Sequence, residues 1–480
     1  MTWGRAFATQ CSTLVSTRRS TILTKRTTHR RRPRAGTPSE ANDHREDIMI
    51  TTRLSRRDLL TLGAAAGAAH LGASGKVFAT GQDDMVYVGW SHTEAGSKAY
   101  LEQVFDRFRA ENKASKLETI GVPFAQVQTT LLLRKRSNQR TDVAQLQERW
   151  LSSFVAAGGM SDVDEIFGSQ FVDKTYHPTA LAMTKINGKR YALPWVAGST
   201  GLVGNAKVME EAGVKEAPRT IDAFVDALRK VKKAKPSSSP MGFSTKNPGL
   251  TQFESQLFFW TFGGSFFDAS GGIVVDSEPN KQALTLLADL VKDGLILPGN
   301  DRFDLRRLFA QEQVAFYPDP PLARAFARAQ SGQGTAYDKN VLPVAMPVLK
   351  AGNEAVSLQW GHLLGMLDYG GAMAAADGPS GRFVKMLSKP EVQIEYYKAT
   401  GAFPSALAAI EALRDDAYLT GWLELSRTAR PDELVSFANA TELSTVIGEE
   451  VAAAMLGQKT PQDALTSMSD RLKAIGPRKS

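Results

Sequence analysis

Short apolar runs alternate with amphipathic segments from residue 85 onward, and this alternation constrains the fold more than any other feature. The runs 85–90, 117–122 and 142–146 have the composition of buried or half-buried strands. Between the first two, apolar residues recur at i, i+3, i+4 and i+7 over 101–108, which predicts one face of a helix. Residues 124–136 form a second predicted helix. The pattern predicts a doubly wound βαβαβ unit, in which ligands bind beyond the carboxyl ends of the strands.

The rest of the chain continues the α/β pattern. An amphipathic helix is predicted over 221–231, closed by a Lys-rich turn and the Pro/Ser segment 236–240. Glycine pairs bracket a turn or hairpin over 263–272. The C-terminal third favours helices, for example over 451–456 and 464–475. No internal repeat is present, so the sequence predicts one large α/β unit.

The net charge of +8 is concentrated in the first 79 residues. They hold 14 of the 58 Lys and Arg but 5 of the 50 Asp and Glu, which leaves 44 basic against 45 acidic residues. A nearly neutral remainder lacks the basic surface that nucleic-acid binding requires. We therefore expect no nucleic-acid partner.

Residues 55–60 (SRRDLL) resemble the twin-arginine export motif. A mildly apolar run follows over 59–73, and it is too short to span a membrane. Small residues stand at the expected cleavage positions in 77–79. We interpret 49–79 as a twin-arginine signal peptide and expect the remainder to reach the periplasm.

The Arg-rich residues 1–48 allow two interpretations: a transit peptide or basic tail, or a stretch upstream of a translation start at Met49. We favour the second and treat 1–48 as an untranslated or disordered extension. Cys11 is the only cysteine, so no disulfide or thiolate metal site is expected downstream. No cysteine near residue 80 offers a lipid attachment point. We expect residues 80–480 to form a free monomer.

The segment INGKRYALPW at 186–195 resembles the N-G-K-x-Y-A-L-P segment of the family 1 extracellular solute-binding proteins, which include the sugar receptors of ABC importers. Further segments resemble the same family in the same order: 90–94, Asp142, 212–214 with 218–220, 309–315 and 453–464. In the string 309–315, Glu312 replaces the usual glycine.

The resemblance implies a two-lobed periplasmic binding protein fold of type II, each lobe a doubly wound sheet flanked by helices. The ligand cleft then lies at the hinge and closes around the solute. We divide the chain into lobe 1, about 84–196 and 345–388, and lobe 2, about 197–344 and 389–475. Two membrane permease subunits are the implied partners.

A sugar presents flat C–H faces and a rim of hydroxyl groups, so its site needs aromatic planes and paired polar groups. Strand ends and the resemblance select the candidates; Asp319 lies where the family places a ligand-facing turn, and Phe253 heads a helix that faces the family's cleft. Trp260 is more typical of a core residue, and Arg149 would suit an acidic sugar. The predicted ligand-binding residues are Trp90, His92, Glu94, Gln147, Trp150, Trp195, Phe253, Asp319, Trp360 and His362.

Two alternatives to a sugar receptor remain. A secreted carbohydrate-active enzyme would need two carboxylates that face each other, whereas the visible acidic pairs, such as 164–165 and 449–450, are sequence neighbours whose side chains diverge on a helix. No hydrolase or nucleotide-binding motif occurs, so no catalysis, cofactor or metal site is expected. A receptor for a polyamine or an amino-acid derivative is the nearer alternative. Pro321, at a position where many relatives have an aromatic residue, leaves the sugar itself open.

Overall fold

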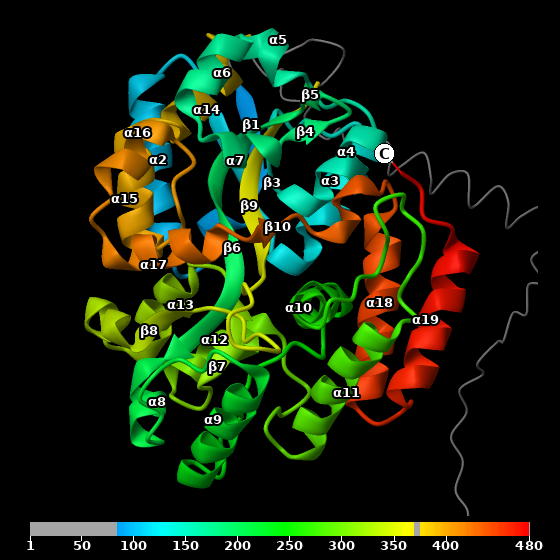
Figure 1. Cartoon of the computed structure of the whole chain (residues 1–480). Helices are drawn as coiled ribbons and strands as arrows, with labels where there is room; N and C mark the ends of the chain where they lie inside the picture. The colour runs from blue at the N-terminus through cyan, green and yellow to red at the C-terminus, as the bar shows by residue number, and fades with distance from the viewer. Residues whose placement is uncertain (1–83, 369–374, 480) are drawn as a thin grey trace, which may run out of the picture. The chain divides into compact units, whose positions relative to one another are not determined.

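The computed structural model describes residues 84–368 and 375–479, which all belong to one compact unit (Figure 1). The predicted extension 1–48 and signal peptide 49–79 lie outside the described residues.

The predicted βαβαβ unit is confirmed. It consists of β1 (Met85–Gly89), α2 (Lys98–Glu111), β2 (Leu117–Gly121), α3 (Phe124–Arg136) and β3 (Val143–Gln147). Strand β1 pairs in parallel with both β2 and β3. All five residues of β1 are buried because helices cover both faces of a parallel sheet. The carboxyl ends of β1 and β3 therefore meet at one edge, from which Trp90 and Gln147 emerge.

Two long strands connect the lobes. β6 (Ala192–Asn205) and β9 (Ser357–Met366) pair antiparallel over most of their length, and β9 also pairs with β3. Beyond β9, β6 continues to pair with β7 (Phe316–Asp319) and β8 (Val341–Val344). The sheet order β2-β1-β3-β9-β6-β7 thus runs from the first lobe into the second.

Helices cover the remaining faces (Figure 1). Those of the second lobe that bear on the site are α10 (Pro248–Thr261), α12 (Arg302–Ala310) and α18 (Ala440–Met455), and α10 lies against α18. The other helices of the second lobe are α8 (Ala206–Glu211), α9 (Ile221–Ala234), α11 (Glu278–Lys292), α13 (Ala323–Ser331) and α19 (Pro461–Ile475). The predicted helices at 221–231 and 464–475 are confirmed as parts of α9 and α19, and the one at 451–456 overlaps the last turn of α18, which ends at Met455.

The first lobe is completed by short helices and by the segment after β9. Helix α15 (Pro390–Thr400) contacts α2 and α14 (Pro379–Leu387) of the first lobe and α13 of the second, so it lies at the boundary between lobes. The remaining elements are α4 (Leu151–Ala156), α5 (Val163–Phe167), α6 (Ser169–Thr175), α7 (Pro178–Ala182), α16 (Leu407–Ala412), α17 (Ala417–Ser426), β4 (Lys185–Ile186), β5 (Lys189–Arg190), β10 (Ala429–Arg430) and the 3-10 turns η1 (Ser91–Thr93), η2 (Glu148–Trp150), η3 (Gly334–Asn340) and η4 (Glu433–Ser436).

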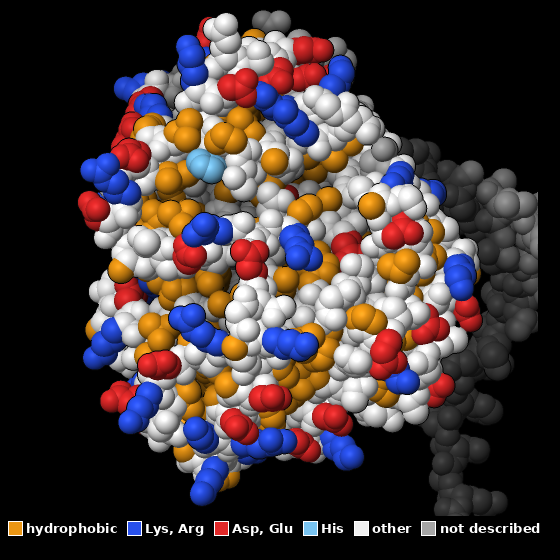
Figure 2. Space-filling model, viewed as in Figure 1, with side chains coloured by type: hydrophobic (Ala, Val, Ile, Leu, Met, Phe, Trp, Pro, Cys, Tyr) orange, Lys and Arg blue, Asp and Glu red, His pale blue; other side chains and the backbone are white. Residues whose placement is uncertain are grey.

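Charges of both signs are interspersed on the face that Figure 2 shows. This distribution agrees with the nearly neutral composition of the chain after residue 79. Among the residues that the structure describes, no helix is both long and apolar enough to cross a bilayer.

Candidate functional site

Two neighbouring hollows lie in the cleft between the lobes. The narrow hollow has a cavity volume of about 30 Å³ and the wide hollow one of about 370 Å³. Both are lined by Phe124 from the first lobe and Leu250 from the second, so they form one continuous site. Their combined size suits a small-molecule ligand. The narrow hollow is lined by Trp90, Glu94, Phe124, Gln147, Leu250, Arg302, Phe303, Arg306, Pro320, Leu322, Trp360 and His362.

Aromatic rings form the first-lobe wall of the narrow hollow. Trp90 lies edge-on to His362, with ring centroids 4.8 Å apart, and to Phe124 at 5.5 Å. Trp360 lies 4.6 Å from the same histidine ring. The β3–β9 register sets this arrangement because it places Gln147 opposite His362. Such a wall offers flat apolar faces beside polar edges, as a sugar ring requires.

His362 is held as a neutral imidazole. Burial, together with the charges of Arg149 and Arg306, lowers its pKa to about 3. The side-chain oxygen of Gln145 accepts a hydrogen bond from the backbone N–H of Trp90. The side-chain nitrogen of Gln145 therefore donates to His362 Nδ1, at 3.1 Å. The imidazole proton therefore lies on Nε2, where it can donate to a ligand.

Two arginines of α12 form the second-lobe wall of the narrow hollow. Asp301 caps this helix in a capping box, and Arg302 and Arg306 then share a face at i and i+4. Arg302 donates to Glu254 Oε1 at 3.0 Å, and Arg306 makes two 2.8 Å hydrogen bonds to Asp319. Both carboxylates are fully buried. The arginines thus line the hollow, and the buried carboxylates of Glu254 and Asp319 balance their charges.

Glu94 is the acidic side chain of the narrow hollow. Burial raises its pKa to about 7, Arg306 opposes this shift, and Asp319 adds to it. Near neutral pH the carboxyl group exists in both protonation states, so it can donate to or accept from a ligand hydroxyl.

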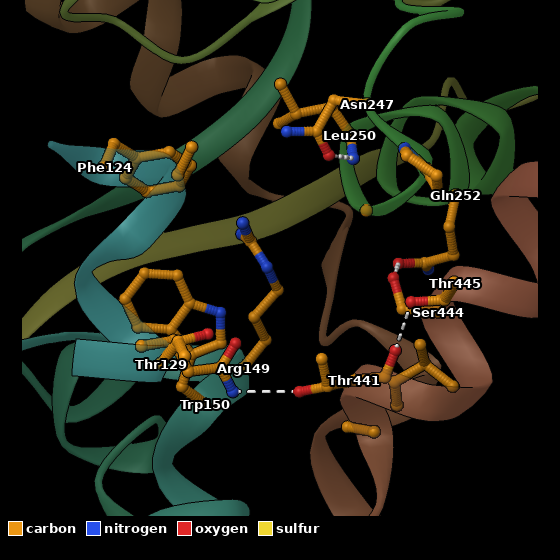
Figure 3. Close-up of a pocket in the computed structure, with 16 residues that line it drawn as sticks. Phe124, Thr129, Arg149, Trp150, Asn247, Leu250, Gln252, Thr441, Ser444 and Thr445 are labelled. Atoms are coloured by element: carbon orange, nitrogen blue, oxygen red, sulfur yellow. Dashed lines mark hydrogen bonds between the residues drawn. The ribbon is translucent and has the colours of Figure 1, made fainter. Parts of the chain in front are cut away.

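The wide hollow has a different chemistry (Figure 3). The first turns of α3, α10 and α18 line it, and hydroxyl and amide side chains alternate there with apolar ones. Gln128 of the first lobe donates to Thr441 Oγ1 of the second at 2.9 Å, so the lobes are in contact here. The residues that line the wide hollow are Phe124, Ala125, Gln128, Thr129, Arg149, Trp150, Asn247, Pro248, Gly249, Leu250, Gln252, Leu434, Ala440, Thr441, Ser444 and Thr445.

Arg149 of η2 extends into the wide hollow (Figure 3). Its guanidinium carbon lies 4.8 Å from the Phe253 ring centroid and 5.8 Å from that of Trp150. Nη1 donates to Gln147 Oε1 at 3.2 Å. Two aromatic rings and one amide thereby hold the guanidinium in place.

The structure brings six of the ten predicted ligand residues to the cleft and places four elsewhere. The six are Trp90, Glu94, Gln147, Trp150, Trp360 and His362. His92 lies between Tyr87 and Phe105, where burial lowers its pKa to about 4. Trp195 stacks on Tyr396 at 5.0 Å. Phe253 and Asp319 lie behind the hollows and support the arginines.

Several lining residues were not predicted from the sequence. Phe124 opens a predicted helix directly after a strand end, which was a usable signal. Arg302 and Arg306 carry a weaker one, the capping residue Asp301 followed by two arginines on one helix face. Thr441 and Ser444 carry none, because nothing local places α18 at the cleft. Among residues 84–368 and 375–479, no cluster of three or more His, Cys, Asp or Glu side chains could hold a metal ion.

The comparisons with known proteins agree with this architecture. Residues 91–394 match the family model described as bacterial extracellular solute-binding protein. The GacH receptor of Streptomyces glaucescens, solved unliganded and with acarbose, superposes with a TM-score of 0.72 at 20% identity, over 82% of this chain and 98% of the receptor. The two-lobed fold expected from the sequence is confirmed.

Curated relatives are similar to the chain at a comparable level of identity. The arabinooligosaccharide-binding protein of Bacillus subtilis is 26% identical over 50% of this chain and 54% of its own length. The sn-glycerol-3-phosphate-binding periplasmic protein UgpB of Pectobacterium atrosepticum is 21% identical over 80% of this chain and 90% of its own. The match spans about half the length of the first curated relatives.

Proposed function

The chain belongs to the bacterial extracellular solute-binding protein family, and from this premise we propose that it captures a saccharide in the cleft between its lobes and delivers it to an ABC importer. The observation that carries the proposal is the composition of the narrow hollow. Aromatic rings from one lobe face polar side chains from both, in particular Glu94 and Arg306. A ligand that touches both walls favours the closed form, because only such a ligand interacts differently with the two states.

A polyamine receptor is the weaker alternative. Polyamines are cations, and their sites need carboxylates that face the ligand. The cleft is lined by Glu94 but also by Arg149, Arg302 and Arg306. This charge balance opposes a polycation.

The proposal includes the location and partners of the protein. The twin-arginine segment at 55–60 would direct it to the periplasm without a lipid anchor, and two permease subunits would receive the closed, loaded monomer. We assign no catalytic step, because the family consists of binding proteins.

Thermal unfolding of the protein with a panel of saccharides, polyols, polyamines and amino acids tests the proposal. A ligand present at 100 times its dissociation constant stabilises the native state by about 2.7 kcal/mol. We expect saccharides to raise the melting temperature and to be recovered chemically unchanged. Stabilisation by polyamines alone would contradict the saccharide assignment, and a cleaved saccharide would contradict the assignment as a receptor.

A further inference from the structure

Among the described residues, Arg149 is the only charged side chain that lines the wide hollow. It has one described hydrogen bond, to Gln147, and no ion pair with a carboxylate of residues 84–368 or 375–479. A guanidinium group has five N–H donors, so four of them lack an acceptor in the described part of the chain. A cation held by Phe253 and Trp150 with most of its donors unused is suited to bind an acceptor from outside the protein.

Arg302 and Arg306 differ from Arg149 in this respect. Glu254 and Asp319 balance their charges through hydrogen bonds of 2.8 to 3.1 Å. The carboxyl groups that act electrostatically on Arg149 are Glu148 and Asp432. Neither lines the wide hollow, and burial raises the pKa of both. The positive charge of Arg149 is therefore exposed to the cavity.

The backbone around Arg149 adds to the positive potential. Three helices of 13 to 16 residues begin at the wide hollow, and the N-cap residues of α3 and α18 make no side-chain hydrogen bond. The first-turn amides of Ala125, Gly249 and Thr441 have no acceptor among the described residues. Unpaired amides at helix N-termini favour an anion.

We propose that the ligand of the cleft is anionic, a saccharide or polyol that carries a carboxylate or phosphate group, and that Arg149 binds this group in the wide hollow. The inference rests on the proposed function, since it names the ligand class of the same cleft. The sugar ring lies against Trp150, which lines the wide hollow, and Phe124, which lines both hollows. Its hydroxyl groups extend toward Glu94 and Gln147 in the narrow hollow, away from the bound anion.

Calorimetric titration with matched ligand pairs tests the inference. The ligands are galacturonate, alginate and glucuronate di- and trisaccharides, each paired with its methyl ester, together with neutral oligosaccharides and glycerol 3-phosphate. The variants are Arg149→Gln, Arg149→Lys and the control Arg109→Gln, whose arginine lies on the exposed face of α2. We expect at least one acid to bind tenfold or more tightly than its ester, and increasing salt to weaken the acid more than the ester.

In Arg149→Gln the preference for the acid over its ester should fall to about one. Arg149→Lys should keep part of the preference and Arg109→Gln all of it. Binding of glycerol 3-phosphate alone, lost in Arg149→Gln, would support the inference and assign the anion as phosphate. Neutral saccharides or esters that bind as tightly as the acids would overturn the inference and leave the proposed function standing. Failure of every neutral and anionic ligand would overturn both.

Discussion

The narrow and wide hollows share one cleft but satisfy their polar groups in opposite ways. In the narrow hollow, Arg302 and Arg306 are balanced by buried carboxylates, and His362 has a fixed tautomer. In the wide hollow, Arg149 has four donors without partners among residues 84–368 and 375–479. The polar groups of the narrow hollow are therefore fixed before the ligand binds, whereas those of the wide hollow gain their hydrogen-bond partners from the ligand.

Removal of the buried carboxylate behind the narrow hollow should have the largest effect. Asp319→Asn leaves Arg306 without its charge partner, and breaking a buried pair costs about 3 to 5 kcal/mol of unfolding free energy. Urea denaturation measures this loss. The control Asp106→Asn removes an exposed partner and should cost about 0.5 kcal/mol or less. Equal effects of the two changes would contradict a pre-organised narrow hollow.

Loss of an aromatic face from the wide hollow should have the second-largest effect. Trp150→Leu should weaken saccharide binding roughly 30-fold, or about 2 kcal/mol, because aromatic anchors dominate binding energy. Trp260→Leu is a matched control, since the two side chains are 9% and 7% exposed and Trp260 lies outside both hollows. Calorimetry measures the dissociation constants. An equal loss in both variants would mean that Trp150 acts on folding and not on the ligand.

The pH dependence of stability should distinguish the carboxyl group of the narrow hollow. Burial raises the pKa of Glu94 to about 7, so the native state binds more protons than the unfolded state between pH 4.5 and 7. The free energy of unfolding then falls as pH rises through this window, by about 1 kcal/mol for Glu94.

Glu94→Gln should remove that part of the slope, measured by urea denaturation from pH 5 to 8. Glu148 and Glu433, whose pKa values burial also raises to about 7, would sustain the remainder. The exposed control Glu102→Gln should leave the slope as in the wild type. A slope unchanged in Glu94→Gln would show that this carboxyl group is solvated.

The smallest effect is expected at the contact that closes the wide hollow. Gln128→Ala removes the hydrogen bond to Thr441, worth about 0.5 to 1.5 kcal/mol, and should weaken ligand binding two- to tenfold. Gln126→Ala, an exposed neighbour on α3, is the control and should have no effect. Stopped-flow dissociation rates are the measurement, since the lost contact belongs to the closed form. Equal rates in the two variants would contradict an interlobe role for Gln128.

The sequence predicted best what depends on local periodicity. The three strands and two helices of 85–147 follow from alternating apolar runs, and their parallel pairing follows from the rules for βαβ units. The 14-residue strand β6 was not predicted, although its first residues belong to the family-like segment 186–195. Its run from one lobe to the other depends on pairing with β9, a partner far along the chain.

The site was predictable where strand ends fix it and unpredictable where distant helices meet. Trp90, Glu94 and Gln147 follow β1 and β3, so their convergence was expected. Gln128 and Thr441 are 313 residues apart, and no local pattern brings α18 to α3. Asp319 was predicted as a ligand residue, whereas the structure gives its carboxylate to Arg306 and Tyr317. Only three-dimensional packing determines which polar groups are already satisfied.

A crystal structure of the protein with the tightest-binding saccharide of the panel tests the central claim most directly. We predict density for the ligand in the cleft, with a sugar face against Trp150 and Phe124, hydroxyl groups within hydrogen-bonding distance of Glu94 or Gln147, and both lobes in contact with it. A ligand bound outside the two hollows, or one that touches a single lobe, would contradict the account.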